Sequence, residues 1–250
     1  MLDRIKKIFF TLMVIMSAQT AHAAINLPNI TLGVQNATTP QEFSQGVQIL
    51  ILLTVLTLAP SIVVMTTAFI RIVIVLVLTR QAIGAASLPP NQVLVGLALI
   101  LTFFVMSPAI TKINETAYQP YMKNAITQEQ ALENAVKPLR DFMFKQTKEQ
   151  ELALFIRLAK LEKPKNKDDV PTYVLIPSFV LSELKTSFKI GFVIFLPFLV
   201  IDLVVASVLV SMGMMFLPPT TIAMPFKLIM FVLVDGWYLV TKSLVEGFMT

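Results

Sequence analysis

The stretch "VQILILLTVLTLAPSIVVMTTAF", residues 47–69, decides the fold class of this chain. It contains no charged residue, and a helix of this length crosses a hydrocarbon core of roughly 30 Å at about 1.5 Å per residue. Pro60 lies within it and is expected to kink the helix, because proline removes a backbone donor and clashes with the preceding turn. The stretch therefore predicts a kinked membrane-spanning helix.

Three more apolar runs follow, at residues 93–110, 192–217 and 222–245. The segment 70–92 carries Arg71 and Arg80 and no acidic residue, which predicts a turn between the first two runs. With 56% hydrophobic residues and a mean hydropathy of +0.76, the chain belongs to the membrane class. We predict an all-α integral membrane protein built from two long kinked helical hairpins, at residues 46–110 and 177–250.

The N-terminus has the layout of a cleavable secretory signal, assigned to residues 1–23. A basic stretch precedes an apolar run that is too short to span a bilayer, and Ala-His-Ala precedes Ala24. Residues 24–45 are rich in Asn, Thr, Pro and Gln and predict an extended, exported segment. With this signal, the mature chain begins outside, and the turns of both hairpins face the cytoplasm.

The absence of cysteine and the loss of His22, the only histidine, constrain the chemistry. A mature chain without either residue lacks the usual ligands of zinc and iron–sulfur sites and the usual nucleophile and base pairs. We expect no metal site, no cofactor and no enzymatic activity. Basic and acidic residues are interspersed, and an exported chain does not meet DNA, so nucleic-acid binding is also excluded.

Residues 111–176 carry most of the charged side chains and predict a helical domain outside the cytoplasm. Thr127 stands three residues before Gln130, which is the spacing of a capping box at a helix start. A second amphipathic helix is predicted at residues 148–163, ended by Pro164. We expect the apolar stripes of these helices to pack against each other or a neighbouring subunit, and the domain to self-associate.

Several charges lie in or beside the apolar segments, where a charge costs several kcal/mol unless it is paired or faces water. They are Arg71, Glu183, Lys185, Lys189, Asp202, Lys227 and Asp235. One interpretation is a proton or ion path. The favoured one is ion pairs within the membrane or between subunits, because most of these charges have a possible opposite partner. On a continuous helix, Lys227 and Asp235 would lie about two turns apart and roughly 80° from each other around the helix axis.

The turn "VSMGMMFLPP", residues 210–219, joins the last two apolar runs. Its soft apolar residues are Met212, Met214, Met215 and Phe216. Three interpretations compete: filling of a core by flexible thioethers, a thioether site for Cu(I), and a deformable ring that closes a pore. The residues alone favour filling over pore closure. Copper is the weakest, because thioether sites usually need more sulfur at regular spacing.

Two long motifs carry a resemblance to a known family. The segments "PSFVLSELKTSFKIGF", residues 177–192, and "PFKLIMFVLVDGW", residues 225–237, resemble the signature segments of the FliP family of flagellar export-gate proteins. "LTLAPSIVVMTTAFIRIVIVLVLTRQAIG" and "PPNQVLVGLALILTFFVMSP" also resemble it, so the likeness extends from about Ile49 onward. Homologues of this family also serve the injectisome type III secretion systems. The signal sequence and the charged domain favour the flagellar branch.

The resemblance implies a homopentamer that assembles with FliQ and FliR into a helical export gate, near FlhB and FlhA. Unfolded flagellar proteins would pass through this gate in the basal body, at the bacterial inner membrane. In that family, consecutive methionines form a gasket around the closed pore, and this motif falls on Met214, Met215 and Phe216. Phe216 stands where many relatives have methionine, and Met212 adds a thioether on the possible pore approach.

Two other functions are weighed against the export gate. The first is a proton or small-ion channel with Asp202 and Asp235 as relay groups, and the second is a scaffold that nucleates basal-body assembly. The resemblance also implies that the hairpins sit largely above the bilayer plane in the assembled gate.

Overall fold

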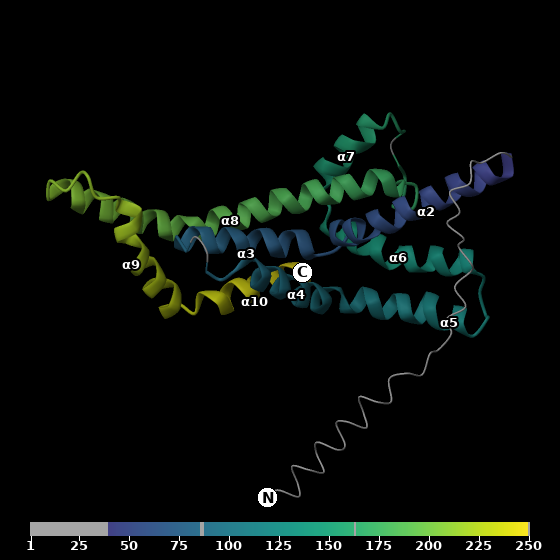
Figure 1. The fold of residues 1–250 in the computed structure, drawn as a ribbon, viewed down its shortest axis with the longest axis horizontal. Helices are drawn as coiled ribbons and strands as arrows, with labels where there is room; N and C mark the ends of the chain where they lie inside the picture. Colours follow the sequence, from purple (N-terminus) through teal and green to yellow (C-terminus); the bar gives the residue numbers. More distant parts are fainter. Residues whose placement is uncertain (1–39, 86–87, 163, 250) are drawn as a thin grey trace, which may run out of the picture. The chain divides into compact units, whose positions relative to one another are not determined.

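The computed structural model describes residues 40–85, 88–162 and 164–249, with side chains described from residue 47 onward (Figure 1). Every regular element in those ranges is a helix, so the predicted all-α class is confirmed there. The chain divides into two units after Leu52, and the packing described below lies within residues 53–249. The elements are α2 (Pro40–Met65), α3 (Phe69–Ile83), α4 (Asn91–Ile113), the π-helix η1 (Asn114–Tyr118), α5 (Gln119–Met122), α6 (Gln128–Gln146), α7 (Glu149–Leu158), α8 (Thr172–Ser211), α9 (Pro219–Leu233) and α10 (Gly236–Met249).

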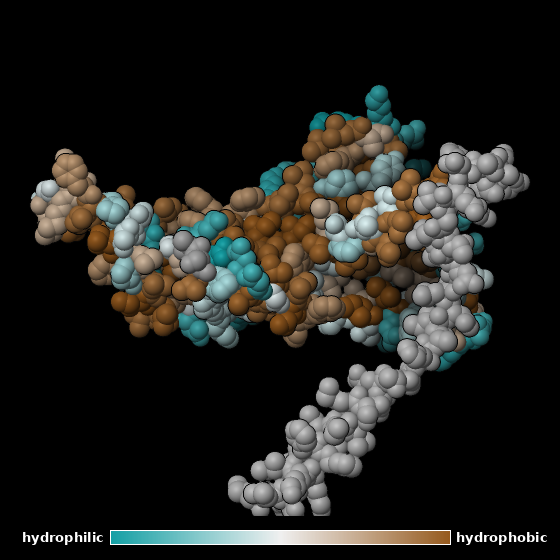
Figure 2. Space-filling model, in the orientation of Figure 1, coloured by the Kyte–Doolittle hydropathy of each residue, from teal (hydrophilic) through white to brown (hydrophobic). Residues whose placement is uncertain are grey.

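Three of these helical segments are long and apolar enough to cross a membrane: Val47–Met65, Asn91–Met122 and Thr172–Ser211. Helices α9 and α10 reach that length only together, and they are bent by 62° at the break between them. Figure 2 shows apolar residues, in brown, over much of the visible surface. By length and composition, the predicted membrane class therefore agrees with the described helices.

The predicted N-terminal segments lie mostly outside the described residues, which exclude the signal peptide at 1–23 and residues 24–39. Residues 40–45 differ from the extended conformation expected of them, because α2 already begins at Pro40. Proline favours the first helical position, and an acidic residue two positions later favours the same turn. The sequence "PQE" at residues 40–42 therefore explains the helical start.

The predicted turn at residues 70–92 is wrong for its first half, because Phe69–Ile83 forms helix α3. The two arginines do not need bulk solvent: Arg71 is 4% exposed, and Arg80 donates to the Pro89 carbonyl at 3.0 Å and to Asn91 Oδ1 at 2.8 Å. The segment predicted as the first hairpin, residues 46–110, thus contains parts of three helices. Helix α2 continues through Pro60, and the break before α3 lies at residues 66–68.

Helix α3 packs along α8, the long helix that runs through the centre of Figure 1. A Cβ atom at Gly191 on α8 would lie 3.2 Å from Leu78 Cβ and would overlap the end of the Leu78 side chain. Glycine permits this close approach of the two helices without a shift of the Leu78 side chain. The main core lies next to this contact and joins α3, α4 and α10. Its fully buried members include Ile72, Leu76, Leu94 and Leu244.

The charged region packs on α8 and is not separate from it. Met143 of α6 shares a core with Leu175 and Phe179 of α8, and Phe155 of α7 packs against the same core. The predicted domain boundary at 176 therefore falls inside α8, and the apolar stripes of α6 and α7 meet on α8. The capping box at Thr127 and Gln130 is confirmed in both directions.

Helix α7 ends earlier than predicted, at Leu158 instead of at the residues before Pro164. Lys160 has a φ of 53°, in the left-handed region that ends a helix. The last apolar run is also discontinuous, since α9 ends at Leu233 and Asp235 has a φ of 53°. The helical relation predicted between Lys227 and Asp235 is therefore wrong, because no single helix contains both.

Candidate functional site

The methionine-rich turn between α8 and α9 has a defined backbone geometry. The Met214 N–H donates to the Leu209 carbonyl at 2.9 Å, and the Gly213 N–H donates to the Val210 carbonyl at 3.0 Å. With Gly213 at a φ of 74°, these two bonds form a Schellman motif, which satisfies the last carbonyls of α8. Pro219 then supplies a preorganised first residue for α9. The turn is a fixed connection.

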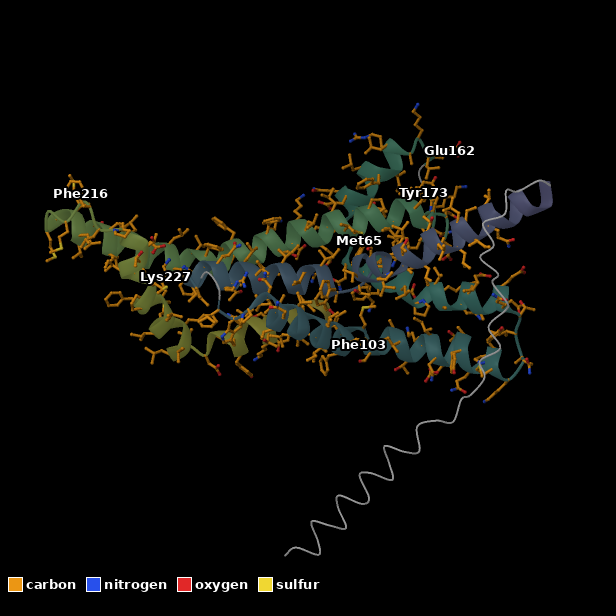
Figure 3. All side chains as sticks on the ribbon, viewed as in Figure 1. Met65, Phe103, Glu162, Tyr173, Phe216 and Lys227 are labelled. Atoms are coloured by element: carbon orange, nitrogen blue, oxygen red, sulfur yellow. The ribbon has the colours of Figure 1, made fainter. Side chains whose placement is uncertain are left out.

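The side chains of this turn project away from the rest of the chain. Phe216 is 100% exposed and Met215 is 72% exposed, while Met212 and Met214 are also exposed. Figure 3 shows Phe216 at the tip of the turn between α8 and α9. These side chains therefore do not fill the core of the described residues. An additional apolar surface would have to cover them to remove them from water.

Asp202 of α8 and Lys227 of α9 form an ion pair at the base of this turn. The Lys227 Nζ atom donates to Asp202 Oδ2 at 2.6 Å, and the Lys227 side chain is only 7% exposed. A cavity of about 330 Å³ lies beside the pair, lined also by the hydroxyl-bearing Thr220 and Thr221. Asp202 Oδ1 is buried there without a hydrogen-bond partner among the described residues. The pair neutralises both charges and fixes α8 against α9.

Arg71 and Glu183 form the most buried ion pair in the described part of the chain. The Arg71 Nε atom donates to Glu183 Oε2 at 2.8 Å, and Nη2 donates to Glu183 Oε1 in a second, short bond. Arg71 also donates to Gln146 Oε1 at 2.8 Å and to the Gly247 carbonyl at 3.2 Å. Its guanidinium lies 3.9 Å from the centre of the Phe248 ring. One side chain thus joins α3, α6, α8 and α10.

Lys185 pairs with a residue that the sequence did not single out, Glu151 of α7. The Lys185 Nζ atom donates to Glu151 Oε1 at 2.8 Å, although Lys185 itself is 46% exposed. This hydrogen bond and the positive charge of Lys185 hold the pKa of Glu151 below its ordinary value. The pair attaches α7 to α8.

Lys189 and Asp235 are exposed, and neither has an ion-pair partner among residues 47–249 that the structure describes. Asp235 instead occupies the left-handed position between α9 and α10, and its carbonyl accepts from the Leu239 N–H at 3.1 Å. Aspartate tolerates this conformation better than most residues. Within the described residues, Asp235 therefore forms part of the connection between α9 and α10.

Gln146 and Glu151, the partners of Arg71 and Lys185, could have been suspected from the sequence. Each stands close to apolar residues of a predicted amphipathic helix, where a polar side chain turned inward needs a partner. Only the tertiary contact identifies that partner as Arg71 or Lys185.

Helices of membrane-crossing length, charges neutralised inside the packing and an exposed apolar turn define an all-helical membrane protein. A sequence model of the FliP family matches residues 52–244, and the chain belongs to this family. Flagellar biosynthetic protein FliP of Bacillus subtilis (strain 168) is 50% identical over 220 residues, covering 88% of this chain and all of the relative. The protein of the same name from Pectobacterium carotovorum is 53% identical over 208 residues, with 83% and 81% covered. That from Caulobacter vibrioides is 50% identical over 232 residues, with 93% and 85% covered.

Proposed function

We propose that this chain is the core subunit of the flagellar type III export gate, and that it forms the channel for unfolded flagellar proteins together with FliQ and FliR. The relatives named above are flagellar proteins at about half identity over most of the chain. The observation that carries the channel role is the exposed apolar turn, since Phe216 is fully exposed and Met215 is largely exposed in the part of the chain that the structure describes.

A ring of such turns would supply an apolar surface to cover these side chains. In a homopentamer, Met214, Met215 and Phe216 of each copy would lie against those of its neighbours and seal the pore. Methionine is unbranched and has a polarizable sulfur, so it adapts to passing chains of different sequence. The Schellman motif at Gly213 would hold the backbone of each turn in place while the side chains move.

The buried charge pairs support assembly in this proposal. Asp202 pairs with Lys227 and Arg71 pairs with Glu183 inside one chain, so these ion pairs would preserve the shape that each copy presents. The exposed Lys189 and Asp235 remain available for contacts between subunits or with FlhB and FlhA at the inner membrane. Cleavage of residues 1–23 and export of the charged helices belong to the same proposal.

Leakage of ions and small molecules across the membrane tests the seal. We expect cells that carry Met214→Ala, Met215→Ala and Phe216→Ala together to leak several-fold more than wild type, because alanine leaves the ring unfilled. A native gel run in parallel checks that assembly is normal. The matched control replaces the same three residues by leucine, which keeps most of the apolar volume and is expected to keep the membrane tight.

Tight membranes with normal assembly in the triple-alanine cells would contradict the gasket. Leakage with normal assembly would also argue against a scaffold that only nucleates the basal body. The proton or small-ion channel is not favoured, because Lys227 neutralises Asp202, while Asp235 lies exposed at a helix break. In the same assay, an Asp202→Asn and Asp235→Asn variant would support that channel only if it lost proton flux with the oligomer intact.

A further inference from the structure

A second cavity, of about 430 Å³, lies between α4, α6 and the end of α10, on the part of the molecule away from the methionine turn. Apolar side chains form much of it, including Phe104, Phe142 and Phe248. Three charged residues belong to the same lining: Lys112, Asp141 and Lys145. This combination of aromatic surface and charge favours an amphipathic ligand.

The position of Lys112 along α4 puts the cavity at the end of a long uncharged stretch of helix. Every residue from 91 to 111 is uncharged, and Lys112 is the first charged residue that follows. At 1.5 Å per residue this uncharged stretch is about 30 Å long, the thickness of a hydrocarbon core. Lys112 therefore lies at the level of lipid headgroups when α4 crosses the bilayer.

The charges of the cavity favour an anion. Lys112 and Lys145 are both exposed, and neither forms an ion pair with any residue that the structure describes. Asp141 offsets only one of the two positive charges. Lysine side chains next to a membrane-crossing helix attract the headgroups of anionic lipids.

An exposed apolar stripe leads away from the cavity along α4. Ile100 and Phe103 are each 68% exposed, and Phe104 is 58% exposed. Residues 100, 103, 104, 107 and 108 recur at the spacing of one helix face, and the last three also line the cavity. Figure 3 labels Phe103 on this helix. The stripe gives acyl chains a surface that is continuous with the site for the headgroup.

We propose that this cavity binds an anionic phospholipid, with its phosphate between Lys112 and Lys145 and an acyl chain along Ile100 and Phe103. Asp141 accepts hydrogen bonds from hydroxyl groups of the headgroup, which fits phosphatidylglycerol. The proposal requires a membrane around α4 but does not depend on the channel function.

The lipid site shares two residues with the surroundings of the buried Arg71. Phe248 lines the cavity and lies under the Arg71 guanidinium, and Gln146 lines it while accepting from Arg71 Nη2 at 2.8 Å. The bound lipid therefore covers the contact that holds the end of α10. Because a ligand that binds only the folded state stabilises it, phosphatidylglycerol raises the unfolding temperature of the protein.

Native mass spectrometry of the full-length protein purified from membranes tests the site. The probes are dioleoyl phosphatidylglycerol and dioleoyl phosphatidylcholine, which share acyl chains and differ in headgroup. We expect phosphatidylglycerol to bind more tightly, and Lys112→Ala with Lys145→Ala to weaken it about thirtyfold. The control, Lys123→Ala with Lys165→Ala, removes two exposed lysines outside the cavity and leaves binding within about twofold of wild type.

Three results overturn the proposal: equal binding of the two lipids, equal loss in the two double variants, or occupation of the cavity by a second copy of the chain. The last appears as loss of oligomer in the Lys112 and Lys145 variant. Glycerol 1-phosphate distinguishes a lipid from a free phosphate compound, since it shares the charge but not the acyl chains. Binding of glycerol 1-phosphate as tight as that of phosphatidylglycerol contradicts a lipid site.

Discussion

A charged residue in an apolar helix is explained, at the scale of single residues, by the partner that it meets. Lys227 meets Asp202 from 25 positions away, and Arg71 meets Glu183 from 112 positions away. The cost of an unpaired charge predicts that such partners exist. It does not identify them, because the pairing depends on which helices pack together. Asp235 shows the opposite outcome, since an exposed helix break removes the need for a partner.

The pair of Glu151 and Lys185 predicts a dependence of stability on pH. The hydrogen bond from Lys185 holds the pKa of Glu151 below its ordinary value of 4.5. The folded state therefore favours the ionised carboxylate, and this contribution to stability is complete above the ordinary pKa and is lost as the pH falls through the lowered one. We expect the unfolding temperature of the wild-type protein to fall more steeply below pH 4.5 than that of Glu151→Gln.

Thermal unfolding in detergent between pH 3 and pH 7 measures this difference. The control is Glu149→Gln, an exposed residue on the same helix that lies outside the α7–α8 ion pair. It should keep the acid dependence of the wild type. Parallel curves for wild type and Glu151→Gln would show that the pair does not stabilise the folded state.

At the scale of the elements, helix ends were easier to predict where a local backbone signal was present. Thr127 with Gln130 predicted the start of α6. The turn at residues 210–219 was also predicted, but the role of Gly213 at the left-handed position that ends α8 came only from the structure. Helix α3 was missed because the arginines at 71 and 80 suggested a solvated turn. Their charges are instead satisfied by side chains and carbonyls of other segments, which no local pattern reveals.

The contact of α3 with α8 depends on Gly191. We expect Gly191→Ala to lower the free energy of unfolding by about 1–3 kcal/mol, because the added Cβ overlaps Leu78 and forces the two helices apart. The matched control is Gly96→Ala on α4, where an added Cβ would meet no atom within 4 Å. That variant should be neutral or slightly stabilising, because alanine favours the helix.

Chemical unfolding of the purified protein in detergent measures both glycine variants. If Gly191→Ala were as stable as wild type, the Leu78 side chain would have moved aside without cost. The approach of α3 to α8 would then not depend on glycine.

At the scale of the whole molecule, Arg71 connects helices that are far apart in the sequence. It contacts Glu183 of α8, Gln146 of α6, and Gly247 and Phe248 of α10. The charged region and the C-terminal helix are thus attached to the same side chain of α3. A change at this position should therefore affect the folding of residues 53–249 together, and not only one helix pair.

We expect Glu183→Ala to cost about 3–5 kcal/mol of unfolding free energy, because it leaves the buried Arg71 charge without its carboxylate. The double variant Arg71→Met with Glu183→Leu should be less destabilised than Glu183→Ala, since neither charge remains buried. The measurement is chemical unfolding in detergent, followed by tryptophan fluorescence and by helical circular dichroism. Lys137→Ala is the control, because its pair with Glu133 is exposed and should contribute less than about 1 kcal/mol.

A change of less than about 1 kcal/mol in Glu183→Ala would contradict the central role of this pair. The same conclusion would follow if the loss of unfolding free energy in the double variant equalled the sum of the losses in the two single variants, because substitutions at independent sites are additive.

The sequence by itself determined the helical membrane class, the family and the position of the methionine turn. These depend on uncharged runs of membrane-crossing length and on long motifs, and both are properties of consecutive residues. Only the tertiary structure decided that residues 69–83 are a helix, that the charged region packs on α8, and which charges pair. The physical reason is that burial and ion pairing depend on side chains brought together from distant positions in the sequence. A local pattern shows only that a charge in an apolar segment needs a partner, and not which residue that partner is.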